Sequence, residues 1–319
     1  MRKILRKYGF ALAIWAGLAT KKGSSHYLEA SDPGKGLQRI EVGEVLMTET
    51  VALIGVGAMG SALLDRLRRV GKTVRAFDIS EAGRRASEDA GAFLASSPAD
   101  AARGAAFIHI FVRTDAEARA VICDKDGVLD TIREGAFILL NSTILPSTTK
   151  EIAFAAIVRG GQVLDAPMTS VPSRVREGKG AFLLGGSIEQ VSIVREYLAT
   201  FGCESYHFGP LGAGNVAKLA RNMVNAAERT VLFEALKIAG SQSVDLRLFL
   251  QMMRDEDQAP LASQWEKAID LEGNEPSLKP GANLFTKDLP LAGDYVRSIG
   301  MTAPIVEAAL AVSSLCRKS

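Results

Sequence analysis

A lysine and an asparagine in the stretch "GNVAKLARNM", residues 214–223, have the types and the spacing that acid–base chemistry requires. The stretch predicts the start of a helix, and Lys218 and Asn222 then share one face because they are four residues apart. A lysine amine exchanges a proton readily once burial lowers its pKa, and an amide one turn away can hold a substrate without competing for that proton. The same polar stripe is also typical of a solvated helix surface, so the rest of the chain must decide between the two interpretations.

A glycine-rich turn earlier in the chain predicts a binding site for a dinucleotide. The apolar run Val51–Ile54 is typical of a buried parallel strand, and the sequence "GVGAMG" joins it to a helical pattern. In this motif the first glycine permits the tight turn, the second lets the backbone approach a pyrophosphate, and the third lets the helix pack closely on the strand. The free N–H groups at the start of the helix face the phosphates. The predicted cofactor-binding residues of this turn are Gly55, Gly57, Ala58, Met59 and Gly60.

The residue that ends the next predicted strand indicates which dinucleotide binds. The segment "TVRAFD" reads as a strand that ends at Asp78, 23 residues after Gly55. A carboxylate at this position accepts hydrogen bonds from the ribose hydroxyls and repels a 2′-phosphate. No basic residue follows it at positions 79–80. We therefore expect NAD as the cofactor, with NADP as the less favoured alternative.

Strand-like and helix-like segments alternate through the first two thirds of the chain. Such alternation predicts an α/β fold with a Rossmann-type doubly wound parallel sheet. Beyond residue 212 helical periodicity dominates, which predicts an all-helical C-terminal domain. The expected organisation is an extension at 1–46, an NAD-binding domain at 47–211 and a helical substrate and dimerisation domain at 212–319. Further strands are expected at 106–112, 137–140, 162–168 and 180–186, and helices at 116–122, 146–158 and 187–201.

Composition excludes several other classes of protein. The 319 residues carry a net charge of +2, with the basic excess in the first 46, so the near-neutral body argues against nucleic acid as a partner. The three cysteines and three histidines have no metal-ligand spacing, so no metal site is expected. His109 lies in the apolar run "AAFIHIFV" and is expected in the core rather than in catalysis.

The first 46 residues are expected to lie outside the fold. Basic residues precede the apolar run Tyr8–Ala19, an order that resembles a secretory signal or a transit peptide. This run is too short to cross a membrane, which requires about 20 residues. Residues 22–43 contain Gly, Ser, Pro and charges without clear periodicity, which suits a linker. We expect a loosely ordered extension, a cytoplasmic protein and no membrane partner.

Five short segments form an ordered set of motifs between residues 49 and 312. They are the glycine turn with Met59 and the segments "NSTILP", "DAPMTSVPSRVREGKGAFLLGG", "GPLGAGNVAKLARN" and "KDLPLA". This set resembles the β-hydroxyacid dehydrogenase family, which includes 3-hydroxyisobutyrate dehydrogenase, tartronate semialdehyde reductase and 6-phosphogluconate dehydrogenase. The resemblance implies hydride transfer between NAD and a small hydroxy-carboxylic acid, by a homodimer or homotetramer.

The resemblance also assigns roles to residues of this chain. It makes Lys218 the general acid/base and Asn222 the residue that orients the substrate. Asp288 is implied to support the "KDLPLA" segment that contains Lys287. The implied substrate-binding residues are Ser142, Thr169, Ser170 and Lys287. The implied additional cofactor-binding residues are Val112, Arg113, Thr143 and Lys287.

The chain departs from the family pattern in the loop after "DAPMT". Ser170 and Val171 stand where the family has paired glycines, so side chains narrow the substrate site there. Arg174, Arg176 and Lys179 follow in the same loop. They are either solvated loop charges or, in the sharper hypothesis, one of the arginines binds a second anionic group of the substrate. The sequence after "APIVEAALAVSSLCRKS" also lacks about one helix of the family, which leaves the assembly open.

Two other functions remain as alternatives. An imine reductase has a related fold but usually carries Asp or Tyr at the position of Lys218. A non-catalytic NAD-binding module would explain the altered loop at 170–171, although Lys218, Asn222, Ser142 and Lys287 argue against it. Phosphogluconate decarboxylation is not expected, because the helical domain is too short for that branch of the family.

Overall fold

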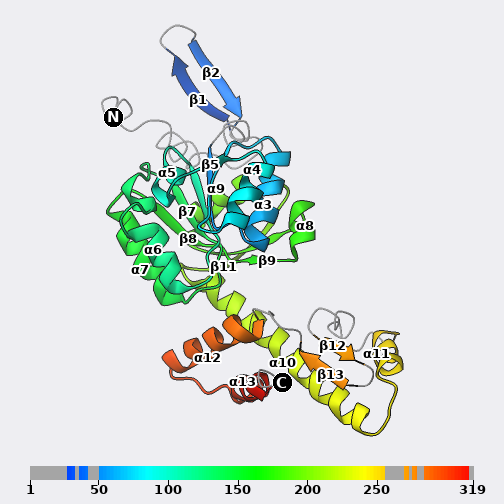
Figure 1. The fold of residues 1–319 in the computed structure, drawn as a ribbon. Helices are drawn as coiled ribbons and strands as arrows, with labels where there is room; N and C mark the ends of the chain where they lie inside the picture. The colour runs from blue at the N-terminus through cyan, green and yellow to red at the C-terminus, as the bar shows by residue number, and fades with distance from the viewer. Residues whose placement is uncertain are drawn as a thin grey trace. The chain divides into compact units, whose positions relative to one another are not determined.

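A computed structural model describes residues 27–32, 36–41, 50–255, 269–272, 275–278 and 284–315. The chain divides into two compact units, Met1–Val216 and Ala217–Ser319, and each has its own hydrophobic clusters. The division falls within the long helix α10 (Ala213–Ser241) (Figure 1).

The first unit is built on a nine-stranded, mostly parallel sheet with the order β11-β10-β8-β7-β6-β3-β4-β5, in which β9 pairs with β10. Neighbouring strands from β8 through β7, β6 and β3 to β4 pair in parallel, whereas β10 runs antiparallel to β8. The strand order reverses at β3, because β4 lies on one side of it and β6 on the other. The strands are β3 (Val51–Ile54), β4 (Val74–Phe77), β5 (Phe93–Leu94), β6 (Phe107–Ile110), β7 (Phe137–Leu140), β8 (Gln162–Asp165), β9 (Met168–Thr169), β10 (Ala181–Gly185) and β11 (Glu204–Gly209).

Helices cover both faces of this sheet, as Figure 1 shows, and they confirm the doubly wound fold that the alternating pattern predicts. One face packs against α3 and α9, and the other packs against α5, α6 and α7. The residues of β3, β6 and β7 are all buried, because both of their faces are covered, which explains why these strands read as continuous apolar runs. The helices are α3 (Ala58–Arg69), α4 (Glu81–Asp89), α5 (Pro98–Ala102), α6 (Asp115–Cys123), α7 (Pro146–Ile157), α8 (Pro172–Arg176) and α9 (Ile188–Ala199), with the 3-10 turn η1 (Val128–Asp130).

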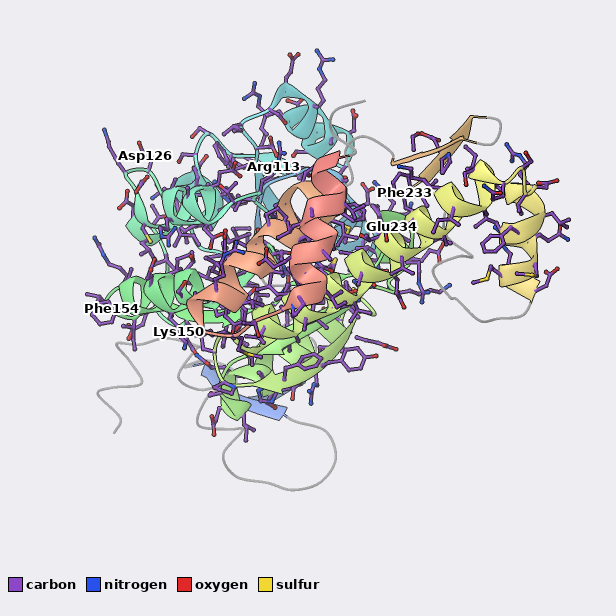
Figure 2. All side chains as sticks on the ribbon, turned by 90° about the horizontal axis from the view of Figure 1, so that it is seen from below. Arg113, Asp126, Lys150, Phe154, Phe233 and Glu234 are labelled. Atoms are coloured by element: carbon purple, nitrogen blue, oxygen red, sulfur yellow. The ribbon has the colours of Figure 1, made fainter. Side chains whose placement is uncertain are left out.

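The starts of these helices are encoded locally. A serine or threonine directly precedes each of four helices: Ser80 precedes α4, Ser97 α5, Thr114 α6 and Ser187 α9. Each hydroxyl accepts a hydrogen bond from a backbone N–H in the first turn of its helix. On α7 the side chains of Lys150 and Phe154 point outward (Figure 2), and Phe154 is 78% exposed. This outward face of α7 contrasts with its buried face, which packs on the sheet.

His109 is a buried residue of the core, as its apolar surroundings in the sequence predict. It lies on β6, where its ring nitrogens bond to Asn141 Oδ1 at 2.8 Å and to the Tyr197 hydroxyl at 3.0 Å. Burial lowers the pKa of His109 to about 4, so the imidazole is neutral at physiological pH. The ring therefore ties β6 to the end of β7 and to α9.

The second unit is mainly helical. Met223 and Ala226 on α10 pack with residues of η3, α12 and α13, and Phe233 and Leu236 pack further along with residues of α11 and β12. Figure 2 labels Phe233 beside Glu234 on α10. The other elements are α11 (Leu246–Asp255), β12 (Ile269–Glu272), β13 (Glu275–Leu278), the π-helical turn η3 (Leu284–Asp288), α12 (Leu289–Ser298) and α13 (Pro304–Leu315).

Two antiparallel strand pairs were not expected from the sequence. In the second unit β12 pairs with β13, so the prediction of an all-helical domain is wrong at this pair, and the other described elements of the unit are helical. Near the N-terminus β1 (Tyr27–Asp32) pairs with β2 (Gly36–Glu41), within the segment that the sequence suggests is a linker. The expected loose order of the rest of residues 1–46 concerns positions outside the described residues. Within the described ranges, no helix has the length and apolar character needed to cross a membrane.

Candidate active site

The predicted cofactor-binding residues lie on loops that follow parallel strands of one sheet. These loops come after β3, β4, β6 and β7, and the carboxyl ends of parallel strands meet at the same edge. The strand order reverses at β3, between β4 and β6, and open α/β sheets bind ligands at the carboxyl ends of the strands next to such a reversal.

The three glycines of the turn are required for different reasons. Gly55 has a φ of +92°, and a Cβ there would lie 2.1 Å from the carbonyl oxygen of Phe111. A Cβ at Gly60 would lie 2.0 Å from the carbonyl oxygen of Gly55, so this glycine lets α3 pack on the turn. At Gly57, by contrast, a Cβ would meet no atom of the described chain within 4 Å. Packing gives no reason for that glycine, whereas the close approach of a pyrophosphate does.

The start of α3 fits a negatively charged group. Gly57 is the N-cap of this helix, and no side chain caps it in the described part of the chain. The first N–H groups of an α-helix have no carbonyl partner within the helix and carry a partial positive charge. Gly57 and Ala58 are exposed and Met59 is half-buried, so the turn presents its backbone outward. This turn therefore fits the diphosphate of a dinucleotide.

Asp78 follows β4 and is fixed beside the glycine turn. Its carboxylate accepts a hydrogen bond from Val56 N at 2.6 Å, and from the Ser80 N–H and hydroxyl at 2.7 and 2.6 Å. Gly83 is required opposite it, since a Cβ there would lie 2.3 Å from the carboxyl carbon of Asp78. The half-buried carboxylate can accept further hydrogen bonds from ribose hydroxyls.

The loops after β6 and β7 are tied together. The Ser142 hydroxyl accepts a hydrogen bond from Val112 N at 2.8 Å and donates to Val112 O at 2.8 Å. Asp115 at the start of α6 accepts a hydrogen bond from Leu145 N at 2.9 Å. Arg113 is exposed in the first of these loops, and Thr143 is buried in the second. The structure thus brings Val112 and Ser142 together, and the hydroxyl of Ser142 serves this link between the loops.

Asp165, at the end of β8, anchors the beginning of α10. Its two carboxylate oxygens accept hydrogen bonds from Gly212 N at 2.7 Å and Asn215 N at 2.8 Å. Burial raises the pKa of Asp165, and these N–H donors oppose that shift. A Cβ at Gly214 would lie 2.2 Å from the carbonyl oxygen of Leu183, so the helix passes very close to β10.

Sequence reasoning missed this anchor, although its signal was present. The sequence shows an acid, Asp165, at the end of an apolar strand, and two glycines, Gly212 and Gly214, at the start of a predicted helix. Asn215 completes it, since its side-chain amide donates to the Thr149 hydroxyl at 2.7 Å.

The segment after β8, which contains β9, holds two of the predicted substrate-binding residues. Thr169 and Ser170 are half-buried, and neither hydroxyl has a hydrogen-bond partner among the described residues. Further along, Arg176 at the end of α8 forms an ion pair with Asp65 at 2.7 Å, and Lys179 after α8 forms one with Glu177 at 3.0 Å. Of the two arginines in the sharper hypothesis, Arg176 therefore has an acidic partner within the protein, whereas Arg174 is exposed and its role stays a prediction.

The second unit brings Lys218, Asn222, Lys287 and Asp288 together. Asn222 Nδ2 donates to Asp288 Oδ2 at 2.9 Å, and Lys287 Nζ lies 3.8 Å from Asp288 Oδ1. The pKa of Lys218 is lowered to about 8, chiefly by burial and then by the charge of Arg221; Asp288 opposes this shift and Lys287 adds to it. Burial also raises the pKa of Asp288, against the charges of the two lysines. A lysine with this pKa exchanges a proton near neutral pH.

Helix α10 does not have the exposure pattern of an ordinary amphipathic surface helix. Asn222 on the polar face is 3% exposed, whereas Val224, Val231 and Ile238 are 58%, 65% and 70% exposed. A solvated surface would show the opposite pattern. The structure therefore argues against the solvated interpretation of the polar stripe at Asn222.

Comparisons with known proteins agree with this geometry. The family model for the NAD binding domain of 6-phosphogluconate dehydrogenase matches residues 50–209. A probable mitochondrial 3-hydroxyisobutyrate dehydrogenase of Dictyostelium discoideum is 29% identical over 79% of this chain and 81% of its own length. An NAD-dependent L-serine dehydrogenase of Pseudomonas aeruginosa is 28% identical over 84% of this chain and 92% of its own.

A solved structure gives the same result. The 3-hydroxyisobutyrate dehydrogenase of Mycobacterium tuberculosis, determined with L-serine, has a TM-score of 0.72 and 26% sequence identity, covering 84% of this chain and 93% of that one. The similarity thus extends beyond the nucleotide-binding part to most of both chains. With its glycine turn, its Asp78 and the NAD-binding domain at residues 50–209, the chain belongs to the β-hydroxyacid dehydrogenase family, which includes the 3-hydroxyisobutyrate and 6-phosphogluconate dehydrogenases.

Proposed function

We propose that this NAD-dependent dehydrogenase oxidises a small 3-hydroxy carboxylic acid, with Lys218 as the general acid/base and Asn222 as the residue that orients the substrate. The observation that carries the proposal is the cluster around Lys218. Its amine has a pKa lowered to about 8, and Asn222 and Lys287 both lie against Asp288. A chain with an NAD-binding domain and such a lysine has both parts that alcohol oxidation needs.

Each part has a defined task in the reaction. When bound, NAD accepts the hydride from the carbon that bears the hydroxyl group. The neutral amine of Lys218 takes the hydroxyl proton, which yields the carbonyl product and a protonated lysine. In the reverse direction the ammonium returns that proton to the carbonyl oxygen. Asn222 holds the substrate without titrating, since an amide is neutral at any working pH.

The chain itself would hold NAD through the first unit. Gly55, Gly57 and Gly60 shape the turn for the pyrophosphate, with Ala58 and Met59 at the start of α3, and Asp78 binds the ribose. We assign Val112, Arg113 and Thr143 to the nicotinamide end, since they follow β6 and β7, next to the turn after β3. Lys287 is proposed to serve both the cofactor and the substrate.

The continuity of α10 supports the role of Lys218. The helix begins beside Asp165 at the carboxyl end of β8 and continues unbroken from Ala213 to Ser241. Lys218 follows the anchored Asn215 by one turn, about 4.5 Å along the helix axis. Lys218 therefore lies in the first turns of a helix whose start is fixed by these hydrogen bonds.

The substrate carboxylate is assigned to Thr169 and Ser170, together with the segment around Ser142. The hydroxyls of Thr169 and Ser170, which have no hydrogen-bond partner among the described residues, support this assignment. Ser142 is proposed to act mainly by holding the loop. The names of the relatives suggest 3-hydroxyisobutyrate and L-serine as candidate substrates. Both carry a hydroxyl group on C3, counted from the carboxyl carbon as C1. Imine reduction is the less favoured alternative, because Lys218 stands where those enzymes usually carry Asp or Tyr.

Assembly and location complete the proposal. The exposed valines and isoleucine of α10 support a homodimer, with a homotetramer as the larger alternative. A cytoplasmic location is proposed for the mature enzyme, although several relatives are named as mitochondrial. Fractionation of cells that express the full chain would test this location.

A substrate screen tests the function. The full chain would be mixed with NAD and, separately, with 3-hydroxyisobutyrate, L-serine and 3-hydroxypropionate, and NADH absorbance followed. We expect NADH from at least one of them, and much slower turnover with NADP because of Asp78. Intact NAD binding without NADH from any hydroxy acid would contradict the proposal and favour a non-catalytic module; reduction of a cyclic imine would favour the imine-reductase alternative.

A further inference from the structure

A relay of buried hydrogen bonds crosses the sheet of the first unit. His109 and Tyr197 are 0% exposed, and Asn141 is 5% exposed. The His109 ring lies between the other two side chains, with Nδ1 2.8 Å from Asn141 Oδ1 and Nε2 3.0 Å from the Tyr197 hydroxyl. Asn141 Nδ2 then donates to the carbonyl oxygen of Ala166 at 2.8 Å. The relay therefore runs from α9 across β6 and the end of β7 to the residue that follows β8.

The contacts fix which atom of each group carries a proton. Asn141 must turn its Nδ2 towards Ala166, because the opposite orientation would bring two carbonyl oxygens together. Its Oδ1 then faces His109 Nδ1, which must carry a proton, so that Nε2 of the same ring must accept one from Tyr197. Burial raises the pKa of Tyr197, so the hydroxyl keeps the proton that it donates. His109 is therefore the neutral Nδ1–H tautomer.

The relay acts where the pairing of two parallel strands stops. The pairing of β7 with β8 ends at Leu140 and Asp165. One backbone bond follows, from Ala166 N to Leu140 O at 2.9 Å, and the Asn141 side chain adds a further link just beyond it. The two segments that leave the sheet at this edge are thus held together by a side chain after strand pairing has stopped.

Stability alone does not account for polar groups at these positions. Buried polar groups give up hydrogen bonds to water, so their bonds to one another add little net stability. The surroundings are aromatic, since the Phe107 ring stacks on Tyr197 and the Phe182 ring lies 6.2 Å from His109. Apolar side chains would also fill such a space. A satisfied network differs from apolar packing because it fixes one arrangement of the groups that it joins.

We propose that His109 is a positioning residue of the substrate site. Acting through Asn141, it sets the separation between the two backbone segments that carry the predicted substrate-binding hydroxyls. Ser142 directly follows Asn141, and Thr169 follows Ala166 by three residues. The inference rests on the proposed dehydrogenase function and adds a residue to that site. His109 is fully buried and acts only through Asn141, so it takes no part in the chemistry itself.

Two substitutions at position 109 separate positioning from packing. Asparagine places its amide nitrogen close to where Nδ1 lies, so His109→Asn keeps the donor to Asn141 and loses the partner of Tyr197. Glutamine is longer by one methylene group and places its amide close to where Nε2 lies, so His109→Gln keeps the partner of Tyr197 and loses the donor to Asn141. Both variants leave a buried polar group unpaired, so both should melt at a lower temperature than wild type.

The kinetics of the two variants should differ. In His109→Gln we expect kcat/KM for the preferred hydroxy acid to fall on the order of 10- to 100-fold, chiefly through KM, because the binding groups are misplaced. In His109→Asn the KM should stay close to the wild-type value. Tyr197→Phe removes the other end of the relay, so it should lower the melting temperature and keep the wild-type KM. Equal KM values in His109→Gln and His109→Asn would overturn the inference.

The position of the proton in wild type gives a test that needs no stable variant. Long-range correlation of ring protons with nitrogen, on protein with 15N-labelled histidine, distinguishes the two neutral tautomers. The chain has three histidines, so few signals have to be assigned. We expect the Nδ1–H tautomer for His109 at neutral pH. An Nε2–H tautomer or a charged ring would overturn the inference.

Hydrogen exchange separates this inference from the proposed function. Mass spectrometry would follow the backbone N–H groups of residues 141–145 and 166–171 in the full chain without cofactor or substrate. We expect both segments to exchange faster in His109→Gln than in His109→Asn. If they do so and wild type oxidises no hydroxy acid, the dehydrogenase proposal fails and the link between the segments stands. If oxidation occurs but neither exchange nor KM distinguishes the two variants, the positioning role fails and the dehydrogenase stands.

Discussion

Single residues of the glycine turn differ in what they do, and the differences identify which of them serves a ligand. Gly55 and Gly60 are required by the protein itself, since a Cβ at either would overlap a backbone oxygen. Gly57 has open space around it and a φ of −72°, which any residue can adopt. Its lack of a side chain therefore serves something other than the fold.

The variant Gly57→Ala tests this separation of roles. We expect its melting temperature to equal or slightly exceed that of wild type, because alanine restricts the unfolded chain. We expect its Kd for NAD to rise by about tenfold or more, because the methyl group occupies the place of the pyrophosphate. Thermal unfolding and calorimetric titration with NAD measure the two effects.

The companion variant Gly60→Ala provides the control for Gly57→Ala. Its Cβ would lie 2.0 Å from a backbone oxygen, so it should unfold at a lower temperature than wild type. Wild-type affinity for NAD in Gly57→Ala would contradict the assignment of this turn to the cofactor.

Much of the candidate site was predictable at the residue scale, for an identifiable reason. The glycine turn and Asp78 are specified by local sequence, and the structure places them side by side through the hydrogen bond from Val56 to Asp78. The contacts among Asn222, Lys287 and Asp288 were not predictable from spacing, since they join residues 66 positions apart. The resemblance to a family supplied these residues, and the roles of Lys218 and Asn222 stay a prediction.

Among the elements, α10 depends most on a contact made far away in the sequence. Its first turn is fixed by Asp165, which accepts hydrogen bonds from Gly212 and Asn215. This carboxylate acts as a cap supplied by another element rather than by the residue before the helix. The start of α10 is thus set by the end of β8.

Removal of this cap should destabilise the protein. For Asp165→Ala we expect the free energy of unfolding to fall by roughly 2–4 kcal/mol, because two buried N–H groups lose a charged acceptor. Urea denaturation followed by circular dichroism measures it. Asp294→Ala removes an exposed acid that pairs with Arg297 and should cost less than about 1 kcal/mol. Equal losses in both variants would show that Asp165 does not hold the helix.

Sequence patterns predicted some of the helices and strands and missed others. β3 and β7 occupy the predicted ranges, because buried parallel strands read as short apolar runs. The short elements β5, α5, α8 and β9 were missed, since two to five residues are too few to show a period. The pair β12–β13 was missed because the pairing of Ile269 with Leu278 depends on a turn and not on helical periodicity.

At the scale of the whole molecule, the apolar stripe of α10 bears on assembly. Val224, Val231 and Ile238 are spaced seven residues apart and are all mostly exposed. Seven residues are two helical turns, so the three side chains form a line along the helix. A line of exposed apolar side chains is typical of a surface that a partner covers. We therefore expect a second copy of this chain to cover it.

The variant Val231→Glu tests this assembly. Light scattering after size exclusion should show wild type at twice the monomer mass of 34.0 kDa, or at four times for a tetramer. A buried, unpaired carboxylate at the interface should shift Val231→Glu towards the monomer. Val158→Glu changes an equally exposed apolar residue at the end of α7 and should keep the wild-type mass. A monomeric wild type would contradict the expectation.

The pH dependence of turnover in Lys218→Met, compared with wild type, tests the central claim most directly. Oxidation needs the neutral amine, so kcat in wild type should rise as pH increases through about 8, and kcat for the reverse reduction should fall over the same range. Lys218→Met should lose this pH dependence and roughly 100- to 10,000-fold in kcat, with the Kd for NAD unchanged. Lys237→Met, at an exposed position of the same helix, should behave as wild type. Turnover of Lys218→Met at the wild-type rate, with the same rise near pH 8, would contradict the account.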